Sequence, residues 1–272
     1  MNIKSFSKLT ENWSTGHKMP VMFVGHGNPM NAMLENDITR GWREMSKDVS
    51  PKAILCISAH WETKGTFVTT TPKPQTIHDF GGFPPDLYQI QYPAPGIPEL
   101  AKEVIRDIKK TSVQEDHDWG LDHGAWTVLI KMFPDANVPV FQMSLDYRQS
   151  PQFHYELGRE LSILRDKGVL IIGSGNIIHN LSTARWNSNE PYEWVTAFDN
   201  KTKELIAEGD HQALINYHNL GTEAKLSIPS NEHYLPMLYT LGLQEKGDKL
   251  AFFNESIDLA SVSMRSFVIS HI

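Results

Sequence analysis

The chain has 272 residues, of which 40% are hydrophobic and 21% are charged, and its formal net charge is −7. These proportions exclude disordered and fibrous proteins, and an acidic chain without Lys/Arg blocks is unsuited to binding nucleic acid or an anionic membrane. The single cysteine, Cys56, excludes an internal disulfide framework, and no apolar run reaches the ~20 residues of a membrane span.

Strands and helices are predicted to alternate along the chain. Short apolar runs bounded by Pro, Gly or polar residues indicate buried strands, and apolar residues at helical spacing indicate helices between them. In chain order we expect strands over 21–24 and 53–57, helices over 100–108 and 125–132, a strand over 138–145, a helix over 157–164, a strand over 169–172, a helix over 194–206 and a strand over 262–269. This order predicts an α/β fold: a single domain with a mostly parallel central sheet flanked by helices.

The ends of the chain and one internal segment stand apart from this pattern. Residues 1–18 are polar and lack the apolar core of a signal peptide, so we expect a flexible extension before one domain over residues 19–272. Residues 70–98 carry seven prolines and three glycines and predict a long loop of the kind that often serves function. We expect a cytoplasmic monomer or homodimer that binds neither nucleic acid nor membrane.

Histidines follow three of the predicted strands. His26 follows the first strand, His60 the second, and His179 the strand over 169–172. Ligands of parallel α/β sheets bind outside the carboxyl ends of the strands, and imidazole is a ligand for Zn, Fe, Cu and Ni. Three histidines in equivalent places therefore predict a metal site at this edge of the sheet. The alternative for each is a buried histidine that is hydrogen-bonded to the backbone.

A further ligand is expected at Glu232-His233, where one residue supplies a carboxylate and the next an imidazole. Adjacent residues rarely both face one metal, so one of the two is the better candidate. Two histidines and one carboxylate would form the facial triad of non-haem Fe(II) oxygenases, whereas three histidines suit Zn(II) or Fe(II).

Two other histidines are candidates for substrate contact. His123 follows Asp122 at the start of a predicted helix, and either its imidazole is held neutral by the helix N-terminus or it is simply an exposed residue after a capping Asp. His78 lies in the proline-rich loop, where the alternative to substrate contact is a hydrogen bond that pins the loop. The remaining histidines are expected to be surface or structural residues: His17, His117, His154, His211, His218 and His271.

Motifs of several other enzyme classes are missing from the sequence. No P-loop, G-x-S-x-G elbow or H-E-x-x-H is present, and the Gly173–Asn176 stretch lacks the last glycine of a dinucleotide fingerprint. Cys56 lies within an apolar run and is expected to be inert.

Seven stretches in order along the chain resemble one family, the class III extradiol ring-cleaving dioxygenases, and within it the 4,5-DOPA dioxygenase extradiol group. The stretches are FVGHGNPM (23–30), ISAHW (57–61), TIHDFGGFP (76–84), YPAPG (92–96), LDHGAW (121–126), GSGN through HNL (173–181) and EHYLP (232–236). The resemblance runs from about Met19 to the C-terminus and implies one catalytic domain over that length.

The resemblance also implies roles for the histidines. His26 and His60 would be metal ligands, and His233 the third, because the DOPA-type branch uses histidine where the protocatechuate branch uses glutamate. His179 would be an acid/base next to the metal or, in a zinc-loaded form, a fourth ligand. His123 would contact a substrate hydroxyl or dioxygen, and His78 the substrate.

The implied reaction inserts O₂ into a DOPA-like catechol ring with 4,5-cleavage, giving a muconic semialdehyde-type product. Fe(II) is the expected cofactor, and Zn(II) can occupy the same site. Two alternatives remain open: a zinc-dependent hydrolase that uses the same histidines to activate water, and a non-catalytic binding protein of the same fold.

Overall fold

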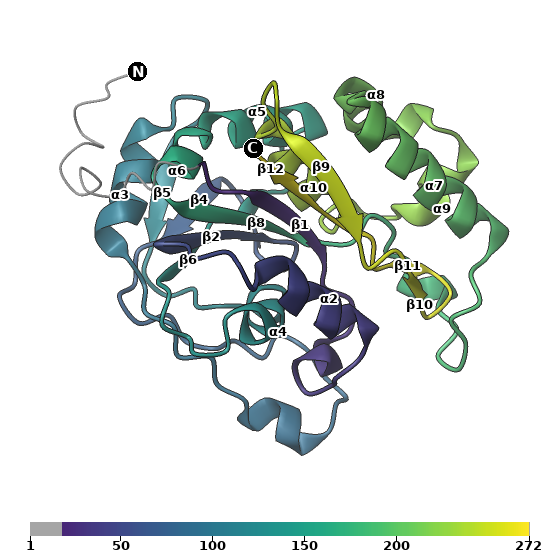
Figure 1. Cartoon of the computed structure of the whole chain (residues 1–272), viewed down its shortest axis with the longest axis horizontal. Helices are drawn as coiled ribbons and strands as arrows, with labels where there is room; N and C mark the ends of the chain where they lie inside the picture. The colour runs from purple at the N-terminus through teal and green to yellow at the C-terminus, as the bar shows by residue number, and fades with distance from the viewer. Residues whose placement is uncertain (1–17, 272) are drawn as a thin grey trace.

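A central sheet with helices on both faces forms the molecule (Figure 1), and the computed structural model describes residues 18–271. The sheet strands are β1 (Val21–Gly25), β2 (Ala53–Ser58), β6 (Val140–Gln142), β8 (Val169–Gly175), β9 (Lys249–Phe253) and β12 (Ser266–Ser270). Their order is β6-β2-β8-β1-β12-β9. The pairs β6–β2, β2–β8 and β8–β1 are parallel, and β12 and β9 are added antiparallel at one edge. The prediction of a mostly parallel α/β sheet is confirmed.

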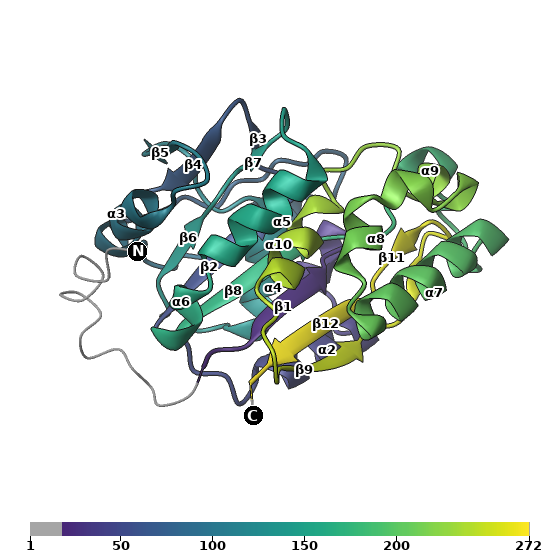
Figure 2. The same ribbon diagram turned by 90° about the horizontal axis from the view of Figure 1, so that it is seen from above.

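Helices of the described residues lie on both sides of the sheet and beside one end of it. They are α2 (Asp37–Ser46), α3 (Pro98–Asp107), α4 (His123–Met132), α5 (Pro151–Glu160), α6 (Ile163–Asp166), α7 (Glu193–Glu208), α8 (His211–Ile215), α9 (Thr222–Ser227) and α10 (Leu235–Gly242). Figure 2 shows α5 and α10 over one face, with α2 and α4 behind the sheet. None of these helices is both long and apolar enough to cross a membrane.

The parallel strands are buried on both faces because the side chains of each strand belong to two hydrophobic cores, one on either side of the sheet. In β1, Val21 and Phe23 belong to the core under α5 and α10, whereas Met22 and Val24 belong to the core under α4. Successive strand side chains point to opposite faces, so a strand covered on both sides must be continuously apolar. This is the physical reason for the uninterrupted apolar runs in the sequence.

Three small two-stranded sheets extend the ends of the main one. They pair β3 (Glu62–Thr63) with β7 (Leu145–Asp146), β4 (Thr66–Thr69) with β5 (Val113–Asp116), and β10 (Ile257–Asp258) with β11 (Val262–Ser263). The apolar run over 138–145 is therefore not one strand but two, β6 and β7, in different sheets. The run over 262–269 likewise divides into β11 and β12.

The helices and the N-terminal extension differ in part from the sequence prediction. The helix expected over 157–164 is two helices, α5 and α6, and the sequence pattern did not predict α2, α8, α9 or α10. The expected flexible extension lies outside the described residues except for Lys18, whose Nζ lies 2.5 Å from Glu245 Oε2.

Candidate metal centre and active-site cavity

Three buried or half-buried imidazoles meet at the carboxyl end of the sheet. One ligand nitrogen from each of His26, His60 and His233 lies within 4.8 Å of the other two. Their ring centroids form a triangle with three sides of 5.0 Å, and His26 Nε2 lies 3.1 Å from His60 Nε2. Two of the three histidines expected at strand ends, His26 and His60, are thus brought together with His233.

The positions of these histidines follow from the ends of three adjacent strands. His26 follows β1 and donates its backbone N–H to the Gly175 carbonyl at the end of β8, 3.1 Å away. His233 approaches the same strand end, because its carbonyl accepts a hydrogen bond of 2.9 Å from the Asn176 N–H. A Cβ atom on Gly175 would lie 2.1 Å from the His233 carbonyl oxygen. Glycine is therefore required for the His233 segment to reach the site.

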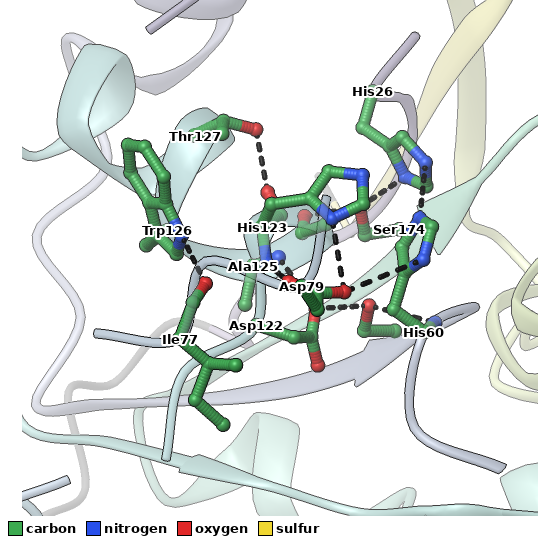
Figure 3. A network of polar contacts seen from close by, with 12 residues as sticks. His26, His60, Ile77, Asp79, Asp122, His123, Ala125, Trp126, Thr127 and Ser174 are labelled. Atoms are coloured by element: carbon green, nitrogen blue, oxygen red, sulfur yellow. Dashed lines mark hydrogen bonds and ion pairs between the residues drawn. The ribbon is translucent and has the colours of Figure 1, made fainter. Parts of the chain in front are cut away.

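Ser174 fixes the orientation of His26. The Ser174 hydroxyl donates to the Gly124 carbonyl at 2.5 Å and lies 2.9 Å from His26 Nδ1 (Figure 3). A carbonyl can only accept, so the hydroxyl proton is committed to Gly124 and the oxygen accepts from His26 Nδ1–H. The neutral His26 ring therefore presents the lone pair of Nε2 to the cluster, as a metal ligand must.

His123 is held by a carboxylate from the proline-rich loop. Asp79 accepts two hydrogen bonds from it, 2.9 Å from the backbone N–H and 3.0 Å from Nδ1 (Figure 3). Burial alone would raise the pKa of Asp79, but the hydrogen bonds and charge of His123 outweigh it and lower that pKa. An ionised Asp79 keeps the proton of His123 on Nδ1. Asp79 also lies 3.6 Å from His60 Nδ1.

The helix that carries His123 begins at a buried cap. Asp122 accepts a hydrogen bond of 3.2 Å from the Ala125 N–H, and its carboxylate also accepts from Ser58 Oγ at 2.5 Å and Gln142 Nε2 at 2.8 Å. Burial, together with the charge of Asp79, raises the pKa of Asp122. His123 itself is buried, and its ring centroid lies 3.8 Å from that of His60. The alternative of an exposed His123 is therefore wrong.

His179 lies beside the triangle of ligands rather than in it. Its ring stacks on that of His233, with centroids 3.5 Å apart and planes 11° from parallel. Glu232 comes from the same segment, and a carboxylate oxygen of Glu232 lies within 4.8 Å of ligand nitrogens of His179 and His233. Both Glu232 and His233 thus lie near the cluster, but only His233 joins His26 and His60.

Burial keeps the imidazoles of His26, His60, His179 and His233 neutral at pH 7. It lowers the pKa of His26 and of His233 well below the ordinary range, and the neighbouring histidines lower both further. Burial, assisted by the charge of His123, lowers the pKa of His60 to about 3 and that of His179 to about 4. A neutral imidazole offers a lone pair, which is the form that binds a metal or accepts a proton.

The residues present fit a divalent transition metal. His233 Nδ1 is buried and has no hydrogen-bond partner among residues 18–271. An orphaned buried nitrogen costs free energy unless something satisfies it, and a cation between three neutral imidazoles would do so. Three histidines without a carboxylate suit Zn(II) or Fe(II).

The cluster opens into a cavity of about 430 Å³. His26, His60, His123, His179 and His233, hereafter the five-histidine cluster, all line it. Its other walls include the apolar side chains of Phe80, Phe83, Leu181 and Trp186. Apolar walls around a few converging polar groups are typical of a site for a small aromatic molecule.

His78 does not line this cavity. Its Nε2–H donates to the Ile90 carbonyl at 3.0 Å, within the proline-rich loop, and its ring packs 5.4 Å from that of Trp126. This geometry is that of the loop-pinning alternative, because the side chain is committed away from the cavity. A direct substrate contact by His78 stays a prediction that the geometry does not favour.

Comparison with known proteins identifies the family. Residues 14–264 match the family described as the catalytic LigB subunit of aromatic ring-opening dioxygenase. A protein of Escherichia coli K12 named 4,5-DOPA dioxygenase extradiol is 44% identical over 92% of this chain and 94% of its own length. One of the same name from Beta vulgaris is 36% identical over 97% of each chain. The crystal structure of an uncharacterized protein of Escherichia coli K12 matches with a TM-score of 0.81 and 38% identity, covering 93% of this chain and all of that one.

The family match places the chain among the aromatic ring-opening dioxygenases. The chain belongs to the LigB family, within the 4,5-DOPA dioxygenase extradiol group that the sequence motifs resemble, and it is an extradiol dioxygenase. The alternatives of a hydrolase and of a non-catalytic binding protein are set aside by this membership.

Sequence reasoning missed the residues that hold the histidines in place. Asp79 and Ser174 lie within the motifs that resemble the family, but the sequence analysis assigned them no role. It did not single out Asp258 of the cavity wall. A signal existed for Asp79, since an acidic residue next to His78 in a loop rich in Pro and Gly is a common functional pattern. Nothing in the sequence pairs Ser174 with His26, because their contact depends on the packing of β8 beside β1.

Proposed function

We propose that this dioxygenase holds Fe(II) between His26, His60 and His233 and cleaves a DOPA-like catechol at the 4,5 position. The product would be a muconic semialdehyde-type compound. The names of the relatives support the substrate class. The observation that carries the proposal is the meeting of three neutral imidazoles within 4.8 Å at the base of a cavity with apolar walls.

Fe(II), when bound, would supply the redox chemistry that lets O₂ react with an aromatic ring. Zn(II) lacks redox chemistry and can occupy the same ligands without supporting the reaction. Overall, the carbon–carbon bond beside the diol breaks, and both oxygen atoms of O₂ enter the product. No reductant is needed, because the ring itself is oxidised.

His179 is suited to move the proton of a catechol hydroxyl. Its imidazole is neutral at pH 7, lines the cavity and stacks on His233, so its ring is fixed next to the ligands. A positioned base of this kind takes a proton as the diol binds and can return it as the ring opens. We therefore assign His179 as the acid/base and not as a ligand.

His123 is suited to contact the reactants. Asp79 holds its Nδ1 proton, which leaves Nε2 for a substrate hydroxyl or for dioxygen. The hydrogen bond from its backbone N–H to Asp79 fixes the start of α4 as well as the ring. An imidazole that is held both through its backbone N–H and through Nδ1 can act without reorganisation during the reaction.

Oxygen uptake by metal-loaded protein tests the proposal. Protein loaded anaerobically with Fe(II), and a parallel Zn(II)-loaded sample, receive L-DOPA or 4-methylcatechol while oxygen and visible absorbance are recorded. Oxygen consumption with a new yellow product in the iron sample alone is expected. Absence of uptake with every catechol, despite stoichiometric iron, would overturn the proposed metal and substrate and direct the search to other aromatic diols and other metals.

The proposal includes the organisation inferred from the sequence: one catalytic domain over residues 19–272, as a monomer or homodimer in the cytoplasm. Limited proteolysis followed by gel filtration tests the first two points. Cleavage confined to the first 18 residues, with activity retained, is the expected result.

A further inference from the structure

The cavity of the proposed site has an uneven charge pattern. Outside the five-histidine cluster, the charged residue in its lining is Asp258, and no Lys or Arg of residues 18–271 lines it. A carboxylate on a bound molecule would therefore find no cationic side chain in this wall, whereas an ammonium group would find Asp258.

The hairpin of β10 and β11 aligns Asp258 with the proposed acid/base. Val262 pairs with His179 on one side and with Asp258 on the other, and all three residues line the cavity. Directly paired residues of neighbouring strands place their side chains on the same face of a sheet. Two strand spacings separate His179 from Asp258 along this row, roughly 10 Å. Asp258 therefore lines the cavity on the same face as His179 but two strands away from it, where a ring substituent can lie.

The carboxylate of Asp258 retains an unused acceptor. Oδ1 accepts a hydrogen bond of 3.0 Å from the Leu259 N–H, and no Lys, Arg or His within residues 18–271 forms an ion pair with Asp258. The residue is half-buried, and burial raises the pKa of its carboxyl group. A partly desolvated carboxylate without a cationic partner is stabilised by any cation that reaches it.

The protein also leaves room for a substituent at this point. A second cavity, of about 450 Å³, shares Asn28, Asp258 and Leu259 with the first. Asp258 therefore lies where the two cavities adjoin. A side chain that leaves the ring in this direction passes the carboxylate and still has space beyond it.

We propose that Asp258 selects catechols whose side chain carries a protonated amine, by pairing with the ammonium group. This rests on the proposed catechol cleavage and adds a specificity-determining residue to it. The competing role for Asp258 is structural. Leu259 and Ala260 both have positive φ, 51° and 63°, in the turn that follows, and Asp258 supports this turn through the Leu259 N–H.

Asp258→Asn separates the two roles, because asparagine keeps the size and the Oδ1 acceptor but removes the charge. Wild-type and variant, both loaded with Fe(II), are compared with dopamine, the neutral 4-ethylcatechol and the anionic 3-(3,4-dihydroxyphenyl)propanoate. We expect kcat/KM for dopamine to fall at least about tenfold in the variant, as for loss of a hydrogen bond between charged groups. The value for 4-ethylcatechol should stay within about twofold, and the anion should improve.

Two further variants complete the design. Asp258→Glu should keep the preference for dopamine over 4-ethylcatechol, and Asp258→Lys should transfer it to the anionic catechol. Asp37→Asn is the matched control, since Asp37 lines only the second of the two cavities and is exposed. It removes the same charge from the same side of the molecule and should leave the three substrates in their wild-type order.

The outcomes distinguish this inference from the proposed function. Equal kcat/KM of the wild type for dopamine and 4-ethylcatechol would overturn the inference while ring cleavage stands, and this comparison needs no variant to fold. A parallel loss on all three substrates in Asp258→Asn would overturn it in favour of the turn-supporting role. If no catechol consumes oxygen, the proposed function fails, and calorimetric binding of dopamine against 4-ethylcatechol to metal-loaded protein decides the role of Asp258 alone.

Discussion

The oxygen of Ser174 accepts the Nδ1 proton of His26, 2.9 Å away, because the hydroxyl proton of Ser174 is already donated to the Gly124 carbonyl. This relationship makes the tautomer of a proposed ligand depend on a residue that never faces the cavity. Ser174→Ala should therefore weaken metal binding by roughly 10–100-fold, as loss of such outer partners does. Competition with a colorimetric chelator measures the change.

Ser46→Ala is the control for this experiment. Ser46 is also a buried serine whose hydroxyl bonds to backbone carbonyls, but it lies in α2. It should lower stability without changing metal affinity. Equal affinities of Ser174→Ala and the wild type would show that His26 is oriented by something else.

Glu232 and His233 offer a second test, because adjacent residues compete for the role of third ligand. His233→Ala should lose the metal and the activity together. Glu232→Gln should retain stoichiometric metal, since Glu232 lies close to His179 and His233 but outside the group formed with His26 and His60. Metal content after dialysis, measured by atomic emission, decides the matter, and the reverse pattern would identify a site with a carboxylate ligand.

His179→Ala separates proton transfer from metal binding. We expect kcat to fall by roughly 10²–10⁴-fold, the usual contribution of a positioned acid or base, with the iron content unchanged. Steady-state kinetics and metal analysis of the same preparation are sufficient. If the variant is purified without metal, His179 is a ligand and the assignment made above is wrong.

Asp79→Asn tests the support of His123. The amide cannot hold a charge beside Nδ1, so the tautomer of His123 is no longer fixed, and we expect a decrease of about 10–100-fold in kcat. The metal should be retained. A second group of potential ligands, His60, Asp79 and His123, satisfies the same distance criterion as the first. Loss of the metal in Asp79→Asn would therefore place the ion in that group instead.

An ion pair far from the cavity gives stability a dependence on pH. The side chains of Arg165 and Asp248 are fully buried, with Arg165 Nη1 2.7 Å from Asp248 Oδ2. Burial alone would raise the pKa of Asp248, but Arg165 and the Glu245 N–H outweigh it and lower that pKa below its ordinary value of 3.8. The stabilisation is therefore complete at pH values above about 4 and is lost as the pH falls through the folded-state pKa.

Asp248→Asn should accordingly cost roughly 3 kcal/mol at pH 7, because it leaves the guanidinium of Arg165 buried without a counter-charge. Urea unfolding at pH 7 and at pH 3 measures the difference between wild type and variant, which should shrink at the lower pH. Glu44→Gln, which removes an exposed partner of Lys47, is the control and should show no such dependence. A difference that does not change with pH would mean that the charge of Asp248 is not what stabilises the fold.

The sequence predicts elements best where burial is uniform. The strands β1, β2 and β8 can be recognised in the sequence because both of their faces are covered and their residues are continuously apolar. The prediction of one strand over 138–145 is wrong for the same reason, since continuous apolarity does not show where β6 ends in the main sheet and β7 begins to pair with β3. Helix α10 escapes prediction because every residue in it is buried, which removes the polar face that marks a helix.

The site was predictable as a set of histidines but not as an arrangement. The ends of β1, β2 and β8 meet at one edge, so strand prediction alone brings His26, His60 and His179 together. The stacking of His179 on His233 depends on a segment before α10 whose path no local pattern reveals. Asp79 lies in a loop and Asp258 in a hairpin, and the positions of both are set by packing against distant parts of the chain.

The close approach of His233 to Gly175 has a thermodynamic consequence. Its segment is held against the end of β8, so a form of the domain in which this segment has left β8 lacks the third member of the ligand set. An ion that binds this set would therefore stabilise the native state as a whole, in proportion to the logarithm of its free concentration. The melting temperature of the domain would then report the concentration of available metal in the surrounding solution.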